Sequence, residues 1–289
     1  RRMIDQHHEA AQKSGSRIVH CCGFDSIPSD LGTYYIQREA KTKTGEYLQQ
    51  VKLRLKAAKG KLSGGTFASM NNVMVEANKD PEVAKNLYNP YGLNPSGEQS
   101  GPDKGDLQSV KYDEDLGAWI MPFIMAAINT RVVRRSHALG GYPYGKDFRY
   151  DEAMSSGEGI TGRLKGYAGL AVLGAMMAGK PDSLYKSLLN KVMPSPGEGP
   201  NLEEREAGYF NFTVIGKYKD GTVMKAKITG DRDPGYGSTS KMLGESAVCL
   251  ALDKKAGSHK SGVLTPSTAM GDALLSRLEE NAGLSFSII

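Results

Sequence analysis

The chain has 289 residues, of which 39% are hydrophobic and 24% charged, as expected for a globular protein long enough for about two domains. Its 37 Lys and Arg are interspersed with 32 Asp and Glu, so no basic block indicates a nucleic-acid partner. Three cysteines without metal-ligand spacing favour a reducing, cytoplasmic compartment over a disulfide framework or a zinc site. The longest apolar stretch, residues 167–179, is shorter than the roughly 20 residues of a bilayer span.

The first elements are typical of half a βαβ unit. Residues 3–13 have helical composition and precede a Ser-Gly-Ser stop, and residues 17–22 (RIVHCC) predict a short apolar strand. The turn GFDSIPSD follows, and we expect Ser29 or Asp30 to cap a helix that begins at Leu31. Because ligands bind at the carboxyl ends of strands in open α/β sheets, this turn is a candidate site.

The middle and the end of the chain alternate between strand and helix patterns. Strands are expected over residues 47–57 and 147–154, helices over 66–78, 116–133, 161–178, 238–252 and 268–280, and a long loop over 89–106. Pro122 would sit in the first turn of the helix at 116–133. The clearest hairpin joins residues 208–218 to residues 223–229 through an Asp-Gly turn.

Two glycine motifs need separate interpretations. The pattern GxGxxG occurs at Gly157, Gly159 and Gly162, but no apolar strand ending in an acid follows it, so we interpret it as a loop with a close helix approach. The segment 64–66 (GGT) stands before a helix, where bare backbone N–H groups can approach a carboxylate or a phosphate. Together with the turn after the first strand, this segment could define a cleft between two domains.

Several reactive residue types have ordinary structural interpretations. His7 and His8 lack partners at metal-ligand spacing and are expected to be solvated on a surface helix. Cys21 and Cys22 are expected to pack at the end of a buried strand, because the sequence identifies no base that would activate a thiol. No serine elbow of the form GxSxG is present.

Two polar segments leave alternatives open. The residues Arg131, Arg134, Arg135 and His137 either bind an acidic substrate or an anionic lipid, or form the positively charged end of a helix. The segment 231–237 (DRDPGYG) is either the wall of a site or a simple turn.

Essentially the whole chain resembles the saccharopine dehydrogenase-like oxidoreductases, in particular their branch of trans-acting enoyl reductases. The motifs that carry the resemblance are RIVHCCGFDSIPSDLG (17–32), GGTFAS (64–69), PGEGP (196–200), RDPGYGSTSKMLGESAVCLA (232–251) and GVLTPSTAMGDALLSRLEENAGLSFS (262–287). The resemblance implies a fold of the α/β class, with a partial Rossmann-like layer and an α+β domain whose helices pack on a mostly antiparallel sheet. Its boundaries would be 1–38 for the Rossmann part, 39–237 for the substrate and dimerisation domain, and 238–289 for the returning segment.

The resemblance also implies what the chain lacks. Members begin with a strand and a Gly-rich turn that holds the cofactor pyrophosphate, and the sequence here opens inside a helical pattern. We therefore expect NAD or NADP to bind the intact parent and no cofactor to bind this fragment, which would be inactive alone. The incomplete sheet would expose an edge and favour a homo-oligomer.

The implied activity is hydride transfer to a C=C or C=N bond of an apolar or lipid-linked substrate, without a metal. The implied site residues are Gly23, Phe24, Asp25 and Ser26 beside the nicotinamide and Gly64, Gly65 and Thr66 beside the substrate. Asp25 and Ser26 either hold their turn through side-chain bonds or touch the ligand; no catalytic acid or base is identified. The alternative is a non-catalytic scaffold of the same fold that works at a lipid or membrane surface, and peripheral membrane contact is possible in either case.

Overall fold

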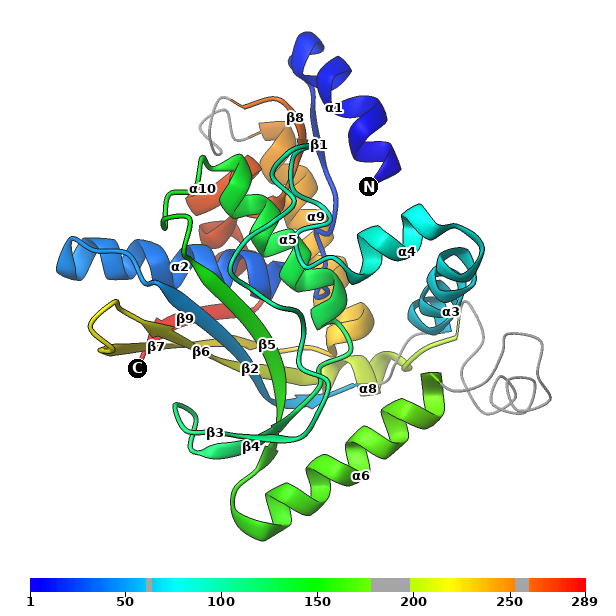
Figure 1. Cartoon of the computed structure of the whole chain (residues 1–289), viewed down its shortest axis with the longest axis vertical. Helices are drawn as coiled ribbons and strands as arrows, with labels where there is room; N and C mark the ends of the chain where they lie inside the picture. The colour runs from blue at the N-terminus through cyan, green and yellow to red at the C-terminus, as the bar shows by residue number, and fades with distance from the viewer. Residues whose placement is uncertain (61–63, 178–197, 253–259) are drawn as a thin grey trace.

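The computed structural model describes residues 1–60, 64–177, 198–252 and 260–289. In these residues a mostly antiparallel sheet has the strand order β3-β4-β5-β2-β6-β7-β9, and a separate pair, β1-β8, is parallel (Figure 1). The strands of the sheet are β2 (Gln50–Lys59), β3 (Lys111–Asp113), β4 (Ala118–Met121), β5 (Arg149–Gly157), β6 (Tyr209–Lys217), β7 (Val223–Gly230) and β9 (Leu284–Ile288). The parallel pair consists of β1 (Arg17–Val19) and β8 (Gly262–Leu264).

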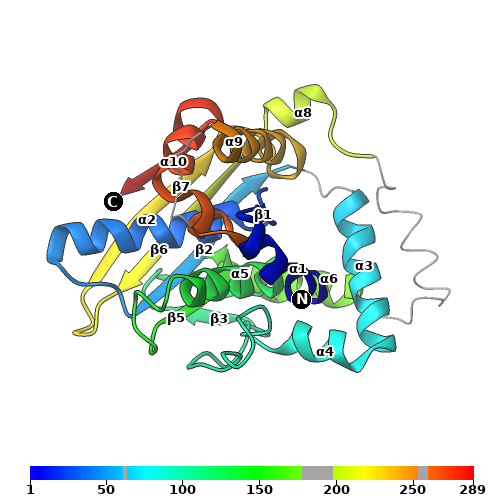
Figure 2. The same ribbon diagram turned by 90° about the horizontal axis from the view of Figure 1, so that it is seen from above.

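The helices cover the sheet unevenly. They are α1 (Arg2–Ser14), α2 (Ile27–Thr44), α3 (Gly64–Lys79), α4 (Pro81–Tyr88), α5 (Ala126–Leu139), α6 (Gly159–Met177), α8 (Leu202–Glu206), the π-helix η1 (Pro234–Ser238), α9 (Thr239–Leu252) and α10 (Pro266–Asn281). Helices α2 and α5 lie against the sheet, and α10 packs on α2 and α9 (Figure 2). Helix α6 lies apart from them beside β4 and β5, at the bottom of Figure 1. The mixed α/β fold with a mostly antiparallel sheet confirms the expected fold class.

The main core lies between α2 and the centre of the sheet. Ile27 and Leu31 of α2 are fully buried, as are Leu53 of β2 and Ile228 of β7. Helix α2 comes so close to the sheet at Gly32 that a Cβ there would lie 2.3 Å from Ile228 Cδ1. The start of α2, which follows the conspicuous turn, is therefore fixed tightly over the sheet.

The expected start of this helix is wrong by four residues. Helix α2 begins at Ile27 with Ser26 as its N-cap residue, and Pro28 lies in its first turn, where its fixed φ suits a helix start. Ser29 and Asp30 lie inside the helix and are buried. The strand before the turn is also shorter than expected and ends at Val19, since Cys21 adopts a φ of 62°.

The expected helix at 116–133 is a second error. Its first part is the strand β4, which pairs with β3 and β5, and a helix begins only at Ala126. Pro122 follows β4 directly and cannot extend the ladder, because it has no N–H to donate. The expected hairpin of β6 and β7, the strand β5 and the helix α6 are confirmed.

In the part of the chain that the structure describes, no helix combines the length and the apolarity needed to cross a membrane. The three-part division at residues 38 and 237 stays a prediction.

Candidate functional site

The turns that follow β1 and β8 lie at the same edge of this parallel pair of strands. Val19 of β1 pairs with Leu264 of β8, and each strand runs on into a helix start, α2 after β1 and α10 after β8. Asp30 of α2 joins the two, because its carboxylate accepts the Ser267 N–H (2.7 Å) and the Ser267 hydroxyl (2.8 Å) of α10. The expectation that Asp30 caps its own helix is therefore wrong. Its carboxylate instead accepts hydrogen bonds in the first turn of α10, whose N-cap residue is Thr265.

The turn residues 23–26 are held mainly by neighbours far away in sequence. Gly23 lies against Thr239, where a Cβ would come within 2.9 Å of the threonine Cγ2. The Phe24 N–H donates to Thr239 Oγ1 (3.0 Å), and the Phe24 ring packs edge-on against Phe210. Ser26 is buried and its hydroxyl donates to Asn129 Oδ1 (3.2 Å).

Asp25 differs from the rest of the turn. Its side chain is exposed and makes no hydrogen bond with any described residue. Of the two roles that the sequence left open for Asp25, holding the turn through side-chain bonds is therefore not the one seen. Surrounding protein atoms nevertheless desolvate the carboxylate and raise its pKa. Asp25 is thus the residue of this turn whose side chain is free to meet a ligand.

The segment 231–237 is not a simple turn, because most of it belongs to the π-helix η1. Asp233 is fully buried, and its Oδ2 accepts the backbone N–H groups of Tyr236 (2.8 Å) and Gly237 (3.3 Å), which fixes the start of η1. The Thr239 hydroxyl, which accepts the hydrogen bond from the Phe24 N–H, itself donates one to Pro234 O (2.8 Å). The π-helix η1 is therefore linked to the candidate cofactor turn through the Thr239 hydroxyl, and short π-helices are frequent at functional sites.

The same π-helix reaches the second candidate segment. The Tyr236 hydroxyl and the Gly64 N–H both donate to one oxygen, the carbonyl of Glu198, each at 3.3 Å. Gly199 lies against the Tyr236 ring, where a Cβ would come within 2.3 Å of a ring carbon. Gly64 is buried, Gly65 exposed and Thr66 half-buried at the start of α3.

Three segments singled out in the sequence thus converge. A path of hydrogen bonds runs from Phe24 through Thr239 to η1, and from Tyr236 through the Glu198 carbonyl to Gly64. Pro196 and Gly197 of the PGEGP motif lie outside the described residues. The structure therefore links the candidate cofactor and substrate segments through η1, a link that no local pattern in the sequence could reveal.

A second polar network extends from the turn into the core. The Asn129 side chain of α5 accepts a hydrogen bond from the Ser26 hydroxyl and donates one to Glu152 Oε2 (3.0 Å). The Tyr150 hydroxyl donates to the other carboxylate oxygen, Glu152 Oε1 (2.6 Å). Burial raises the pKa of Glu152 to about 7 and that of Asp30 to about 6. Sequence reasoning missed Glu152 and gave Asp30 only a capping role. Each acid is followed by an apolar residue, Ala153 or Leu31, but preceded by a polar one, so the local pattern does not mark either as buried.

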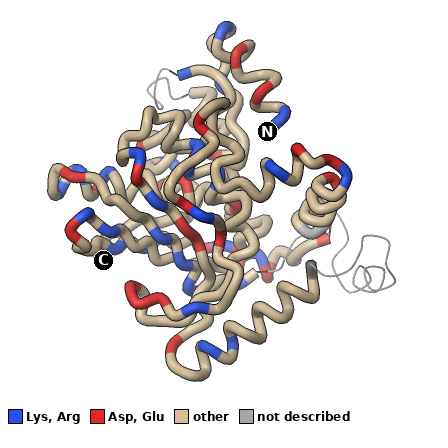
Figure 3. Tube along the Cα trace, in the orientation of Figure 1, with Lys and Arg blue, Asp and Glu red and all other residues tan. Residues whose placement is uncertain are grey.

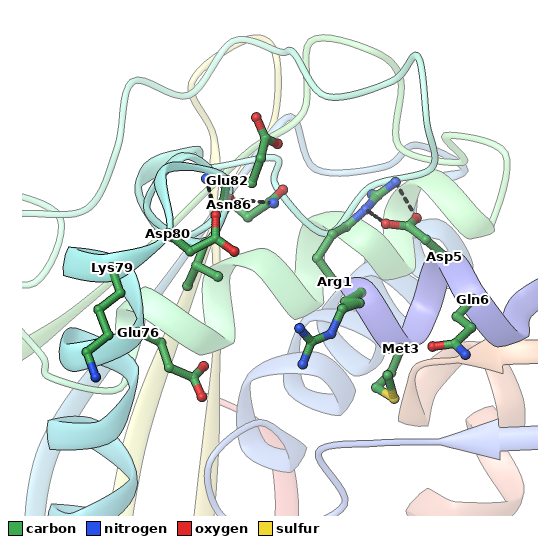
Figure 4. Close-up of a pocket in the computed structure, with 11 residues that line it drawn as sticks. Arg1, Met3, Asp5, Gln6, Glu76, Lys79, Asp80, Glu82 and Asn86 are labelled. Carbon is green, nitrogen blue, oxygen red and sulfur yellow. Dashed lines mark hydrogen bonds and ion pairs between the residues drawn. The ribbon is translucent and has the colours of Figure 1, made fainter.

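One large cavity lies elsewhere. It measures about 950 Å³ and lies between the start of α1 and the helices α3 and α4, lined mainly by polar residues such as Arg1, Asp5 and Glu76 (Figure 4). A second cavity of about 480 Å³ is lined by Ser136 and Ser267, the two hydroxyl partners of Asp30. Neither cavity is lined by residues 23–26 or 64–66, so the expected cleft between these segments is not one of them.

The cationic run on α5 binds within the protein. Arg131 pairs with Asp106 and Arg134 with Asp103, while Arg135 donates to backbone carbonyls, so the long loop 89–106 is fastened onto α5. The four side chains, His137 included, are buried. The expectation that they either bind an external anion or form a charged helix end is wrong, because their partners are internal acids and carbonyl oxygens.

The histidine and cysteine expectations hold in part. His7 is exposed, but His8 is not merely solvated, because its Nδ1 accepts the Val263 N–H (3.1 Å) and so ties α1 to β8. Cys22 is buried, which raises the pKa of its thiol to about 11, and Cys21 is half-buried. Among the described residues, no cluster of His, Cys, Asp and Glu could hold a metal ion.

Several mycobacterial proteins are similar to this chain. A Mycobacterium tuberculosis protein, provisionally named a trans-acting enoyl reductase, is 41% identical over 295 residues, which cover 99% of this chain and 70% of the relative. Proteins named trans-acting enoyl reductase from Mycobacterium ulcerans and Mycobacterium bovis are 38% and 36% identical, over 97% and 96% of this chain and 69% of each relative. No family model and no solved structure matches the chain.

Proposed function

Since the chain belongs to the family of trans-acting enoyl reductases, we propose that it is an oxidoreductase that reduces a carbon–carbon double bond with a hydride from NADH or NADPH. The observation that supports this is the hydrogen-bonded path through η1, which ties the turn 23–26 to the segment 64–66. An apolar or lipid-linked acyl group and an intermolecular partnership are parts of the same proposal.

The residues present fit one end of such a cofactor. The turn 23–26 lies at the carboxyl edge of the parallel pair, where α/β sheets bind nucleotides. The exposed carboxylate of Asp25 repels a pyrophosphate but can accept a hydrogen bond from the amide of a nicotinamide. The nicotinamide supplies the hydride when bound, and Gly23, Phe24, Asp25 and Ser26 would border it.

The substrate segment has the complementary chemistry. Gly64 N–H and the Tyr236 hydroxyl already donate to one carbonyl oxygen, that of Glu198. The carbonyl of an enoyl group is an acceptor of the same kind. If it took the place of the Glu198 carbonyl, these two donors would stabilise the negative charge that develops on it during reduction. We assign Gly64, Gly65 and Thr66 to the substrate carbonyl on this ground, with Tyr236 as an additional donor.

The test is a titration of the full-length protein with NADH and with NADPH, followed by the fluorescence of the reduced nicotinamide. We expect saturable binding of at least one of them. Asp25→Asn should weaken it by roughly tenfold, as the loss of one charge-assisted hydrogen bond predicts. Its free energy of unfolding should change by less than about 1 kcal/mol, because no described residue forms a hydrogen bond with the Asp25 side chain.

Glu46→Gln is the matched control, because Glu46 is an exposed acid beyond the other end of α2. It removes the same charge and should leave cofactor binding unchanged. No affinity for either nucleotide would refute the proposed function. A weaker binding that is equal in Asp25→Asn and Glu46→Gln would refute the role of Asp25 alone.

A further inference from the structure

Helix α6 rests on the sheet through its glycines. A Cβ on Gly162 would lie 2.1 Å from Gly157 O, and one on Gly166 would lie 2.9 Å from Ser156 Oγ. A Cβ on Gly169 would lie 2.5 Å from Met121 Sδ. The side of the helix without side chains therefore faces β4 and β5, and the larger side chains point elsewhere.

The opposite side of α6 is an exposed apolar stripe, formed by Ile160, Leu164, Tyr167, Ala168, Ala171 and Val172. These residues follow the spacing i, i+4, i+7, i+8, i+11 and i+12 of one helix face. Ile160 is 79% exposed, Leu164 64% and Val172 60%. A contiguous row of large apolar side chains in water is unfavourable and marks an interaction surface.

The charged side chains of α6 are all basic, which favours an anionic partner. Arg163 and Lys165 are exposed near its start, and no acidic residue occurs from Gly159 to Met177 (Figure 3). Glu158 precedes the helix and lines a small pocket together with Lys56. The Arg163 guanidinium lies over the rings of Trp119 (5.2 Å) and Tyr167 (5.9 Å), and basic and aromatic residues beside an apolar stripe suit the headgroup region of a bilayer.

We propose that α6 docks the protein on the surface of an anionic phospholipid bilayer, with the apolar stripe among the upper acyl chains and Arg163 and Lys165 at the phosphates. A second copy of the chain fits less well, because its α6 has no acid to pair with Arg163 or Lys165. This surface lies outside the path through η1, so the proposal does not depend on the proposed function.

The chain carries its own reporter for the test. Trp119 is its single tryptophan and lies under Arg163 beside α6. The full-length protein would be mixed with vesicles of phosphatidylcholine alone or of equimolar phosphatidylcholine and phosphatidylglycerol, then separated by flotation. We expect it to float with the anionic vesicles and to remain behind with the neutral ones. Lipids brominated near the headgroup should quench Trp119 fluorescence in the anionic vesicles.

Matched variants locate the contact. Leu164→Ser combined with Val172→Ser should reduce the bound fraction at least about tenfold, because two apolar side chains no longer enter the bilayer. Leu202→Ser on α8 should bind as the wild type does, although Leu202 is 63% exposed, almost the same as Leu164. All positions are exposed, so melting temperatures should agree and a folding defect would be visible.

Three results would overturn the proposal. The first is the absence of flotation with anionic vesicles, and the second is equal binding by the wild type and the double variant. The third is a stable dimer in sedimentation without lipid that the double variant converts to a monomer, which would assign the stripe to a second copy.

Discussion

Helices α5 and α6 invert the usual relation between polarity and burial. Six polar or charged side chains of α5 are buried, from Asn129 to His137. By contrast, four large apolar side chains of α6 are exposed, namely Ile160, Leu164, Tyr167 and Val172. The difference lies in what surrounds each helix. The loop 89–106 packs against α5 and brings acids and carbonyl oxygens to its arginines, while α6 touches the sheet chiefly through glycines. Burial follows from partners, which hydropathy alone does not identify.

The largest expected effect would break the polar packing of α5. Asp103 accepts a hydrogen bond from Arg134 Nε (2.7 Å) and another from the Tyr150 N–H (3.2 Å). Asp103→Ala leaves a buried guanidinium without its counter-charge and should lower the free energy of unfolding by about 3–5 kcal/mol in urea titrations.

Glu82→Ala is the control for this variant. Glu82 and Lys85 form an exposed ion pair on α4, and the loss of such a pair should cost less than about 1 kcal/mol. Equal effects of Asp103→Ala and Glu82→Ala would show that burial adds nothing to the α5 pair.

The pH dependence of stability tests the same buried face through Glu152, which Asn129 of α5 contacts. Burial raises the pKa of Glu152 from 4.5 to about 7 in the folded protein, so the folded state binds the proton more tightly than the unfolded chain. The stabilisation is complete below about pH 4.5 and is lost as the pH rises to about 7, by roughly 3 kcal/mol in total.

Urea titrations across this range should therefore show the wild type losing stability relative to Glu152→Gln, which carries no titrating group there. Asp30, whose pKa is raised to about 6, contributes equally to both proteins and cancels in the difference. Parallel curves for the two proteins would contradict a raised pKa at Glu152.

The smallest expected effects on stability concern the glycines of α6. A Cβ on Gly162 would collide with Gly157 O, whereas a Cβ on Gly174 meets no atom within 4 Å. Gly162→Ala should lower the free energy of unfolding by about 1–3 kcal/mol, and Gly174→Ala should raise it by up to about 1 kcal/mol through helix propensity. A loss in both variants would mean that α6 does not rest on the sheet through its glycines.

Local signals predicted elements well wherever the chemistry of the element is local. The Asp-Gly turn at Asp220 and Gly221 predicted the β6–β7 hairpin, and Gly15 ends α1 in the left-handed conformation. The apolar run around Pro122 led to the wrong prediction of one helix over residues 116–133, because a buried strand followed by a helix has the same hydropathy as one long helix.

The candidate site could be predicted only as separate segments. Motif resemblance marked the turn 23–26 and the segment 64–66, but Thr239 and Tyr236 join them through contacts that span up to 215 residues. Nothing in the local pattern around Arg134 indicates that Asp103 of a featureless loop will neutralise it. Tertiary partners of this kind decide the polar interior, and they leave no periodic trace in the sequence.

The position of β2 in the middle of the sheet sets the order in which the chain can fold as it leaves the ribosome. Gln50 of β2 pairs with Arg149 on one side and with Lys217 on the other. Neither neighbour exists when β2 is made, and the first arrives roughly a hundred residues later, which is several seconds at ordinary rates of synthesis. During that interval a strand with alternating apolar and basic residues has both edges open, so nascent chains should depend on chaperones until β5 has emerged.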